Sequence, residues 1–235
     1  MFSASISNGM RLLARGQAQR SFSSGSSVSI LEQLALDAKR MKHPSLEMRM
    51  DFGKRVVNAV DDAVSSNEGR VAKQFGMGMS AISRAGDHLS ALALLRRMHS
   101  LNVKPSVMTY TCAMTACEKS GEYKEAVSLF NAISQQADGA CCAVYLRCLG
   151  QTEHHSVLID LIQKSPDHIR TDPFVISAML QTLLRSGEHQ PTLEFLATIP
   201  EEKLNSVHYG AAIAAVSKAG RAADALGLLE KAGRS

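Results

Sequence analysis

One short motif recurs along this chain: a basic residue, a small residue and glycine. Its four copies are Arg84-Ala85-Gly86, Lys119-Ser120-Gly121, Arg185-Ser186-Gly187 and Lys218-Ala219-Gly220. The glycines are 35, 66 and 33 residues apart, and 66 is two periods of 33. Five residues after each glycine stands Ala or Thr, and eleven residues before it stands Phe, Tyr or Ile. Such self-similarity at one period indicates a repeat architecture.

The residues around each glycine have the periodicity of two successive helices. Before Gly121, apolar side chains recur at i, i+3, i+4 and i+7: Tyr110, Ala113, Met114 and Cys117. After it the same spacing recurs at Ala126, Leu129, Phe130 and Ile133. Gly121 can adopt the left-handed conformation that ends a helix. Because one hairpin cannot bury its apolar faces alone, we expect an all-α fold, an α-solenoid of about four to five stacked helical hairpins over residues 70–235.

A degenerate copy is predicted between Gly121 and Gly187, over Asp138–Asp172, with Thr152 in place of the glycine. At an offset of 31 from the preceding copy, its first helix carries Val144, Tyr145 and Cys148. Its second helix carries Val157, Leu161 and Ile162. Asp172-Pro173 is typical of an N-cap followed by proline at the first helical position. This dipeptide therefore marks the start of the next copy.

Residues 30–69 precede the clear copies and form a second region. Two or three helices are expected there, over Ile30–Met41 and Leu46–Val64, interrupted at Pro44. They are either a cap or a degenerate repeat. Gly53 stands 33 residues before Gly86, in phase with the turn glycines.

The first segment, residues 1–29, has three arginines and no acidic residue and is rich in serine. An acid-free amphipathic segment is typical of an organellar transit peptide, and a disordered basic tail is the alternative. The run from Arg20 to Gly25 resembles the mitochondrial two-step processing signal, which implies cleavage after Ser21 and again near Ser29. We therefore expect the mitochondrial matrix, with a plastid as the alternative. A secretory signal would need a longer apolar core.

Composition and spacing exclude several other classes. The chain is 45% hydrophobic, too apolar for a fully disordered protein, and no run of about 18 uncharged apolar residues predicts a membrane span. The cysteines lack CxxC spacing and are expected to be small buried apolar side chains: Cys112, Cys117, Cys141, Cys142 and Cys148. The eight histidines lack ligand spacing, and neither a P-loop nor GxGxxG nor GxSxG occurs. We expect no catalytic residue, no metal and no cofactor.

The stretch KPSVMTYTCAMTACEKSGEYKEAVSLF, residues 104–130, resembles a pentatricopeptide repeat. The family pattern begins on KP and TY, turns at a KAG-like tripeptide and continues into a second helix of the form EALELF. The resemblance covers residues from about 70 to 235. The tetratricopeptide repeat is the alternative, but its signature contains a tryptophan and this chain has none. The resemblance implies an organellar protein that binds single-stranded RNA, one base per repeat.

In this family the fifth and the last residue of each repeat read the base. The fifth residues here are Gly76, Thr111, Cys142, Ser177 and Gly210. The last residues are Ser106, either Ala137 or Asp138, Asp172 and Asn205. The resemblance implies two good reading pairs, Thr111 with Asp138 and Ser177 with Asn205. The pairs Gly76 with Ser106 and Cys142 with Asp172 are poor.

Charge argues against a long RNA footprint. Outside residues 1–29 the chain carries 23 basic and 22 acidic residues, and only residues 70–106, with a net charge of +5, are clearly basic. The candidates for phosphate contact are Arg70, Lys73, Arg84, Arg96, Arg97 and Lys104. A solvated helix face is the alternative explanation of this cluster.

Two functions therefore remain. One is RNA binding in mitochondrial RNA metabolism or translation, to single-stranded RNA or rRNA. The other is a structural scaffold in a large assembly, above all the mitochondrial ribosome, where other subunits would be the partners. The last repeat ends soon after Leu228-Leu229, and another subunit is expected to cover it.

Overall fold

The computed structural model describes residues 27–233 apart from 42–43, 67–70, 153–154 and 187–188. Residues 1–26 and Arg70 therefore lie outside the described part. Within that part the chain forms thirteen α-helices and no strand. The elements are α2 (Ser27–Arg40), α3 (Leu46–Ser65), α4 (Val71–Ala85), α5 (His88–Ser100), α6 (Val107–Ser120), α7 (Tyr123–Asn131), η1 (Ser134–Gln136), α8 (Gly139–Leu149), α9 (His155–Gln163), α10 (Asp167–Arg170), α11 (Pro173–Ser186), α12 (His189–Ala197), η2 (Glu201–Lys203), α13 (Ser206–Lys218) and α14 (Ala222–Ala232).

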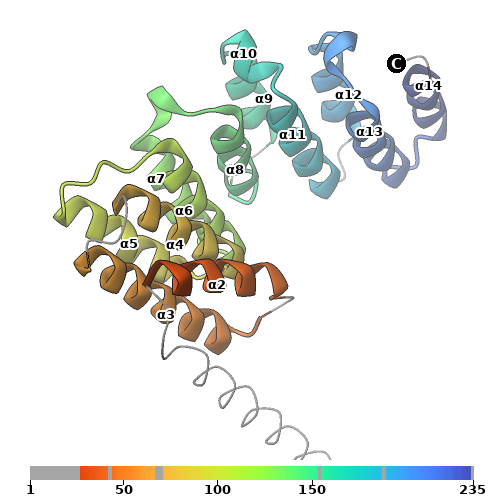
Figure 1. Ribbon diagram of the computed structural model, residues 1–235. Coiled ribbons are helices and arrows are strands. Elements are labelled where there is room, and N and C mark those ends of the chain that lie inside the picture. The colour runs from red at the N-terminus through yellow and green to blue at the C-terminus, as the bar shows by residue number, and fades with distance from the viewer. Residues whose placement is uncertain (1–26, 42–43, 67–70, 153–154, 187–188, 234–235) are drawn as a thin grey trace, which may run out of the picture.

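The helices pair into hairpins that follow one another along the chain (Figure 1). We call α2, α4, α6, α8, α11 and α13 the first helices, because each begins a hairpin. The second helices are α3, α5, α7, α9, α12 and α14. Each first helix packs against the next one, so the first helices form a continuous row. The all-α solenoid predicted from the repeat is confirmed, with five hairpins after residue 70 and a sixth, α2–α3, stacked on α4.

The turn glycines have the conformation that the motif predicts. Gly86, Gly121 and Gly220 have φ angles of 76°, 83° and 76°. In this left-handed region a side chain costs about 1–2 kcal/mol, so glycine is favoured. The backbone N–H of Glu122 then donates to the Cys117 carbonyl at 2.9 Å, which closes the end of α6. Gly53 does not belong to this series, because it lies buried inside α3 rather than at a turn.

The degenerate copy is shifted by one residue from the predicted alignment. Four of its six buried side chains on α8, Cys141, Leu146, Cys148 and Leu149, match the buried Thr109, Met114, Ala116 and Cys117 at an offset of 32, and the other two are Ala143 and Val144. The fifth residue of this copy is therefore Ala143 and not Cys142. On α9 the core side chains are Leu158 and Ile162, whereas Val157 is 49% exposed. Almost every residue of α8 is apolar, so periodicity alone could not fix the phase.

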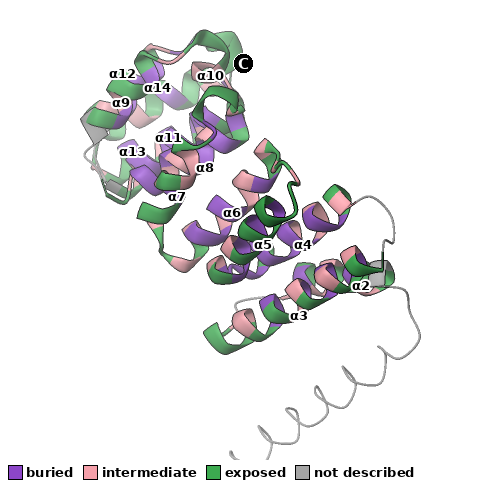
Figure 2. Ribbon diagram, turned by 90° about the vertical axis from the view of Figure 1, so that its left-hand side faces the viewer, coloured by how far each residue is buried: buried purple, intermediate pink, exposed green. Residues whose placement is uncertain are grey.

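Buried residues gather on the faces that the helices turn toward one another (Figure 2). They form two large clusters, one from α2 to α6 and one from α8 to α14. A small third cluster joins them, and four of its seven buried members carry sulfur: Met114, Cys117, Ala126, Ile133, Cys141, Val144 and Cys148. The degenerate copy therefore stands at the joint between the two halves of the solenoid.

Candidate nucleic-acid interface

The last residue of each repeat caps the first helix of the next. Ser106, Asp138 and Asn205 accept the backbone N–H three residues ahead at 3.2, 2.8 and 3.0 Å. Asp172 Oδ1 accepts from the backbone of Phe174 at 2.8 Å. On α8 the N-cap is Asp138 and not Ala137, so Asp138 has the same place as Ser106 and Asn205 on their helices. Asp138 keeps its second oxygen, and Asn205 keeps its amide donor, for an additional partner.

The members of each predicted reading pair belong to neighbouring first helices, one on the helix and the other at the N-cap of the next. Thr111, half-buried on α6, lies beside the Cys141 thiol of α8, and the backbone N–H of Cys141 donates to the cap residue Asp138 at 2.8 Å. Ser177 is half-buried on α11. Next to α11, the ring of His208, which shares the capping box of Asn205, lies 3.3 Å from the Pro173 carbonyl oxygen. The Thr111 hydroxyl donates to the Val107 carbonyl at 2.9 Å, which leaves its lone pairs as acceptors.

A row of exposed apolar side chains was missed by the sequence reasoning. Met108, Phe174 and Val207 are 69%, 65% and 66% exposed, and each stands thirteen residues before a turn glycine. The equivalent residue of α4 is Lys73, which is also exposed. Each side chain lies three residues before a fifth position, one turn away on the same helix face. Their common distance from the turn glycines can be read from the sequence, but only burial shows that they are exposed and not part of the core.

The first helices from α4 onward are basic although the chain is nearly neutral. They carry six basic side chains and one acidic side chain, Glu118. The basic ones are Lys73, Arg84, Lys119, Arg147, Arg185 and Lys218. From α7 onward the second helices carry two basic and five acidic residues. The net charge of a whole segment adds the charges of first and second helices together. It therefore did not reveal this separation, and Arg147, Arg185 and Lys218 were missed.

The predicted phosphate contacts do not form one patch. Lys73 and Arg84 lie exposed on the first helix α4, whereas Arg96 and Arg97 lie on the second helix α5. Arg97 Nε pairs with Asp61 of α3 at 2.9 Å. Lys104 is exposed in the segment between α5 and α6. Lys73 and Arg84 alone share the row of first helices with the predicted reading residues.

Lys119 is held by hydrogen bonds to backbone carbonyl groups of the preceding hairpin. Its Nζ donates to the carbonyls of Ser83 and Arg84 at 2.9 and 3.0 Å, at the end of α4. Burial lowers the pKa of this ammonium group. The Lys119 carbonyl in turn accepts from Arg49 of α3 at 3.3 Å. This lysine therefore ties three hairpins together at their turns and is not available for a phosphate.

Cys117, Cys141 and Cys148 are buried in the core as expected, whereas Cys112 and Cys142 are only partly buried. Burial raises the pKa of Cys117 and Cys148 to about 12, and that of Cys142 to about 11, so these thiols stay protonated. Cys141 Sγ lies 3.9 Å from Met114 Sδ. Among the described residues no group of three or more His, Cys, Asp or Glu side chains could hold a metal ion. In that same part, no helix has the length and hydropathy to cross a membrane.

The fold and this face define an α-solenoid repeat protein with a basic, partly apolar row of first helices. Two comparisons make the class specific. The family model for the PPR repeat matches residues 108–135, which contain most of the α6–α7 hairpin. Over 135 residues the chain is 27% identical to a chloroplastic pentatricopeptide repeat-containing protein of Arabidopsis thaliana, covering 54% of this chain and 15% of that protein. The matched repeat overlaps the stretch 104–130 that carries the resemblance, and the chain spans 15% of the length of this relative.

Proposed function

We propose that this chain is a non-catalytic organellar protein that binds single-stranded RNA along its first helices, in RNA metabolism or translation. The observation that carries the proposal is the separation of charge, with basic residues on the first helices and acidic ones on most second helices. Affinity for nucleic acid depends mainly on basic groups that neutralise phosphates. Arg84, Arg185 and Lys218 are exposed at equivalent places, two residues before their turn glycines.

The opposite ends of the same helices suit the bases. Exposed Met108, Phe174 and Val207 lie one turn from Thr111, Ser177 and Gly210. Apolar side chains can contact the face of an unpaired base, while hydroxyls and the free Asp138 and Asn205 groups can bond its edge. In this arrangement phosphates follow the ends of the first helices and bases follow their beginnings. Because Ala143 and Gly210 cannot bond a base edge, the sequence preference should be weak.

Charge-reversing substitutions on the first helices and on a second helix test this proposal. Single-stranded RNA should bind the full chain with a salt dependence that falls by about 0.7 per phosphate contact removed. Arg84→Glu, Arg185→Glu and Lys218→Glu should each weaken binding. The matched control is Arg96→Glu with Arg97→Glu on the second helix α5, which should leave binding unchanged. Equal loss in both sets would contradict the proposed face.

For the compartment we propose the mitochondrion, with a plastid as the alternative. The support is the acid-free, Arg- and Ser-rich segment 1–29 and its resemblance to a two-step processing signal. The relative from Arabidopsis thaliana is chloroplastic, which supports an organelle of either kind. Residues 1–29 fused to a fluorescent protein should direct it to mitochondria, and plastid import would overturn this assignment.

The second candidate is a scaffold subunit of a large assembly, with the mitochondrial ribosome as the foremost example. It is favoured by exposed leucines on second helices: Leu161 of α9 is 37% exposed, and Leu226 and Leu229 of α14 are 62% and 58% exposed. Sedimentation of organelle extract with and without RNase, combined with crosslinking to RNA, separates the two candidates. A free protein crosslinked to RNA contradicts the scaffold, and a particle-bound protein without RNA crosslinks contradicts RNA binding.

A further inference from the structure

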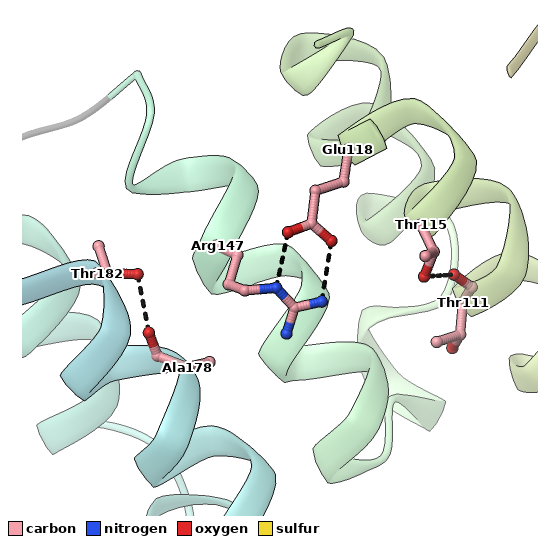
Figure 3. A network of polar contacts seen from close by, with 6 residues as sticks. All are labelled: Thr111, Thr115, Glu118, Arg147, Ala178 and Thr182. Atoms are coloured by element: carbon pink, nitrogen blue, oxygen red, sulfur yellow. Dashed lines mark hydrogen bonds and ion pairs between the residues drawn. The ribbon is translucent and has the colours of Figure 1, made fainter. Parts of the chain in front are cut away.

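The single acidic side chain of the first helices from α4 onward is bound to a basic one on the next first helix. Glu118 of α6 accepts two hydrogen bonds from Arg147 of α8, at 2.7 Å from Nε and 2.9 Å from Nη2 (Figure 3). The pair bridges the joint between the two halves of the solenoid. About a quarter of each side chain is exposed, 24% for Arg147 and 21% for Glu118. The pair is therefore held firmly but can be reached from solvent.

The place of this pair within the basic row is specific. Lys73 and Arg84 stand on α4 before it, and Arg185 and Lys218 stand on α11 and α13 after it. Without Glu118, Arg147 would join the two groups into one row. The residues three before the other turn glycines, equivalent to Glu118, are Ser83, Leu184 and Ser217, and all are uncharged. The carboxylate is thus peculiar to this joint.

Helix stability does not account for a carboxylate at this place. Glu118 lies in the last turn of α6, where the helix dipole disfavours negative charge. The side-on fork of arginine suits a carboxylate and a phosphate equally well. Because the pair is partly buried, the Arg147 guanidinium would be poorly solvated without an anion. Replacing the Glu118 carboxylate with a phosphate therefore costs less free energy than leaving Arg147 without any partner. A phosphate oxygen pair can therefore take the place of the two Glu118 oxygens.

We propose that Glu118 is an intrachain competitor of RNA, which holds Arg147 until a phosphate of the RNA backbone replaces its carboxylate. This inference rests on the proposed RNA-binding function. RNA that crosses the joint gains little charge neutralisation from Arg147, because the released carboxylate must take up a cation. RNA bound on only one half of the solenoid does not meet the pair.

The test measures RNA binding by the full chain over a series of salt concentrations. A single-stranded RNA long enough to span all hairpins is used with wild type, Glu118→Gln, Arg147→Gln and the double variant. Glu118→Gln should bind about fivefold more tightly near 0.1 M salt, with a slope steeper by about 0.7, the effect of one added phosphate contact. Arg147→Gln in the Glu118→Gln background should abolish the whole gain.

A control variant is available on the second helices. Asp61→Asn frees Arg97 of α5 from a single, more exposed ion pair and should leave RNA binding unchanged. If wild type binds RNA but Glu118→Gln binds no more tightly, the pair is only a structural clamp and the inference is overturned. If Glu118→Gln fails to fold, Glu118→Ser decides, because serine stands at the equivalent places Ser83 and Ser217; a folded Glu118→Ser without tighter binding overturns the inference. If no variant binds RNA, wild type included, the proposed function fails together with it.

Discussion

The Asp172 carboxylate lies directly against the backbone of Gly139, at the place where a Cβ of residue 139 would stand. Asp172 caps α11, and Gly139 is the first residue of α8. The two first helices thus approach closely at their N-terminal ends because residue 139 has no side chain. This contact sets the spacing between the degenerate copy and the copy that follows it.

Gly139→Ala is therefore expected to destabilise the protein. A Cβ must displace the Asp172 side chain, which costs the cap of α11, about 1–2 kcal/mol. Chemical denaturation followed by circular dichroism measures the loss. Gly210→Ala on α13 is the control, since nothing lies within 4 Å of its Cβ position. The control should be neutral or more stable by up to about 1 kcal/mol. Two variants of equal stability would contradict the close approach.

Gly121→Ala should destabilise for another reason. Its Cβ position is empty, but its φ of 83° lies in the left-handed region. The expected loss is about 1–2 kcal/mol of unfolding free energy. Gly76→Ala, inside α4 and also without neighbours within 4 Å, should instead gain up to about 1 kcal/mol. A stabilised Gly121→Ala would show that the turn of this repeat is not left-handed.

Lys119→Met should loosen the contact between the ends of α4 and α6. The substitution keeps much of the apolar stem but leaves two carbonyls, of Ser83 and Arg84, without their ammonium donor. The bond to Ser83 is partly buried and the bond to Arg84 is exposed, so their loss should cost about 0.5–1.5 kcal/mol of unfolding free energy. Lys124→Met, exposed on α7, is the comparison and should change stability by less than about 0.5 kcal/mol. The midpoint of thermal unfolding distinguishes them, and equal midpoints would contradict the structural role.

Stability should fall below neutral pH through His208. Burial, opposed by the hydrogen bond to Pro173, lowers the pKa of this imidazole below its ordinary 6.5. Nδ1 accepts the Asn205 backbone N–H at 3.2 Å, so a proton there breaks the capping box. A lowered folded pKa means that the contribution is complete above the unfolded value and is lost as pH falls through the folded one.

The measurement compares unfolding temperatures of wild type and His208→Gln from pH 7.5 down to 5. Glutamine can also accept the N-cap amide but does not titrate in this range. The variant should lose less stability than wild type over this interval. Parallel curves would assign the pH dependence to other groups.

The repeat motif was sufficient to predict the hairpins, their turns and the capping role of Asp172, because each depends on local spacing and glycine conformation. The alignment between repeats could not be fixed where the sequence is uniformly apolar, as in α8. There the sequence placed the fifth residue of the repeat at Cys142, whereas the structure places it at Ala143. The basic row could not be predicted by segment, because its members are separated by acidic second helices. Likewise, only packing reveals that Arg97 pairs with Asp61 and Arg147 with Glu118.

The central claim is that RNA lies along the first helices, with bases near their beginnings. Crosslinking of full-length protein to a photoreactive single-stranded RNA, followed by mass spectrometry, measures this most directly. We expect crosslinked peptides to contain Met108, Phe174 or Val207 and to lie in α6, α11 and α13. Crosslinks confined to the second helices α5, α7, α12 and α14, or none in a protein shown to be folded, would contradict the account.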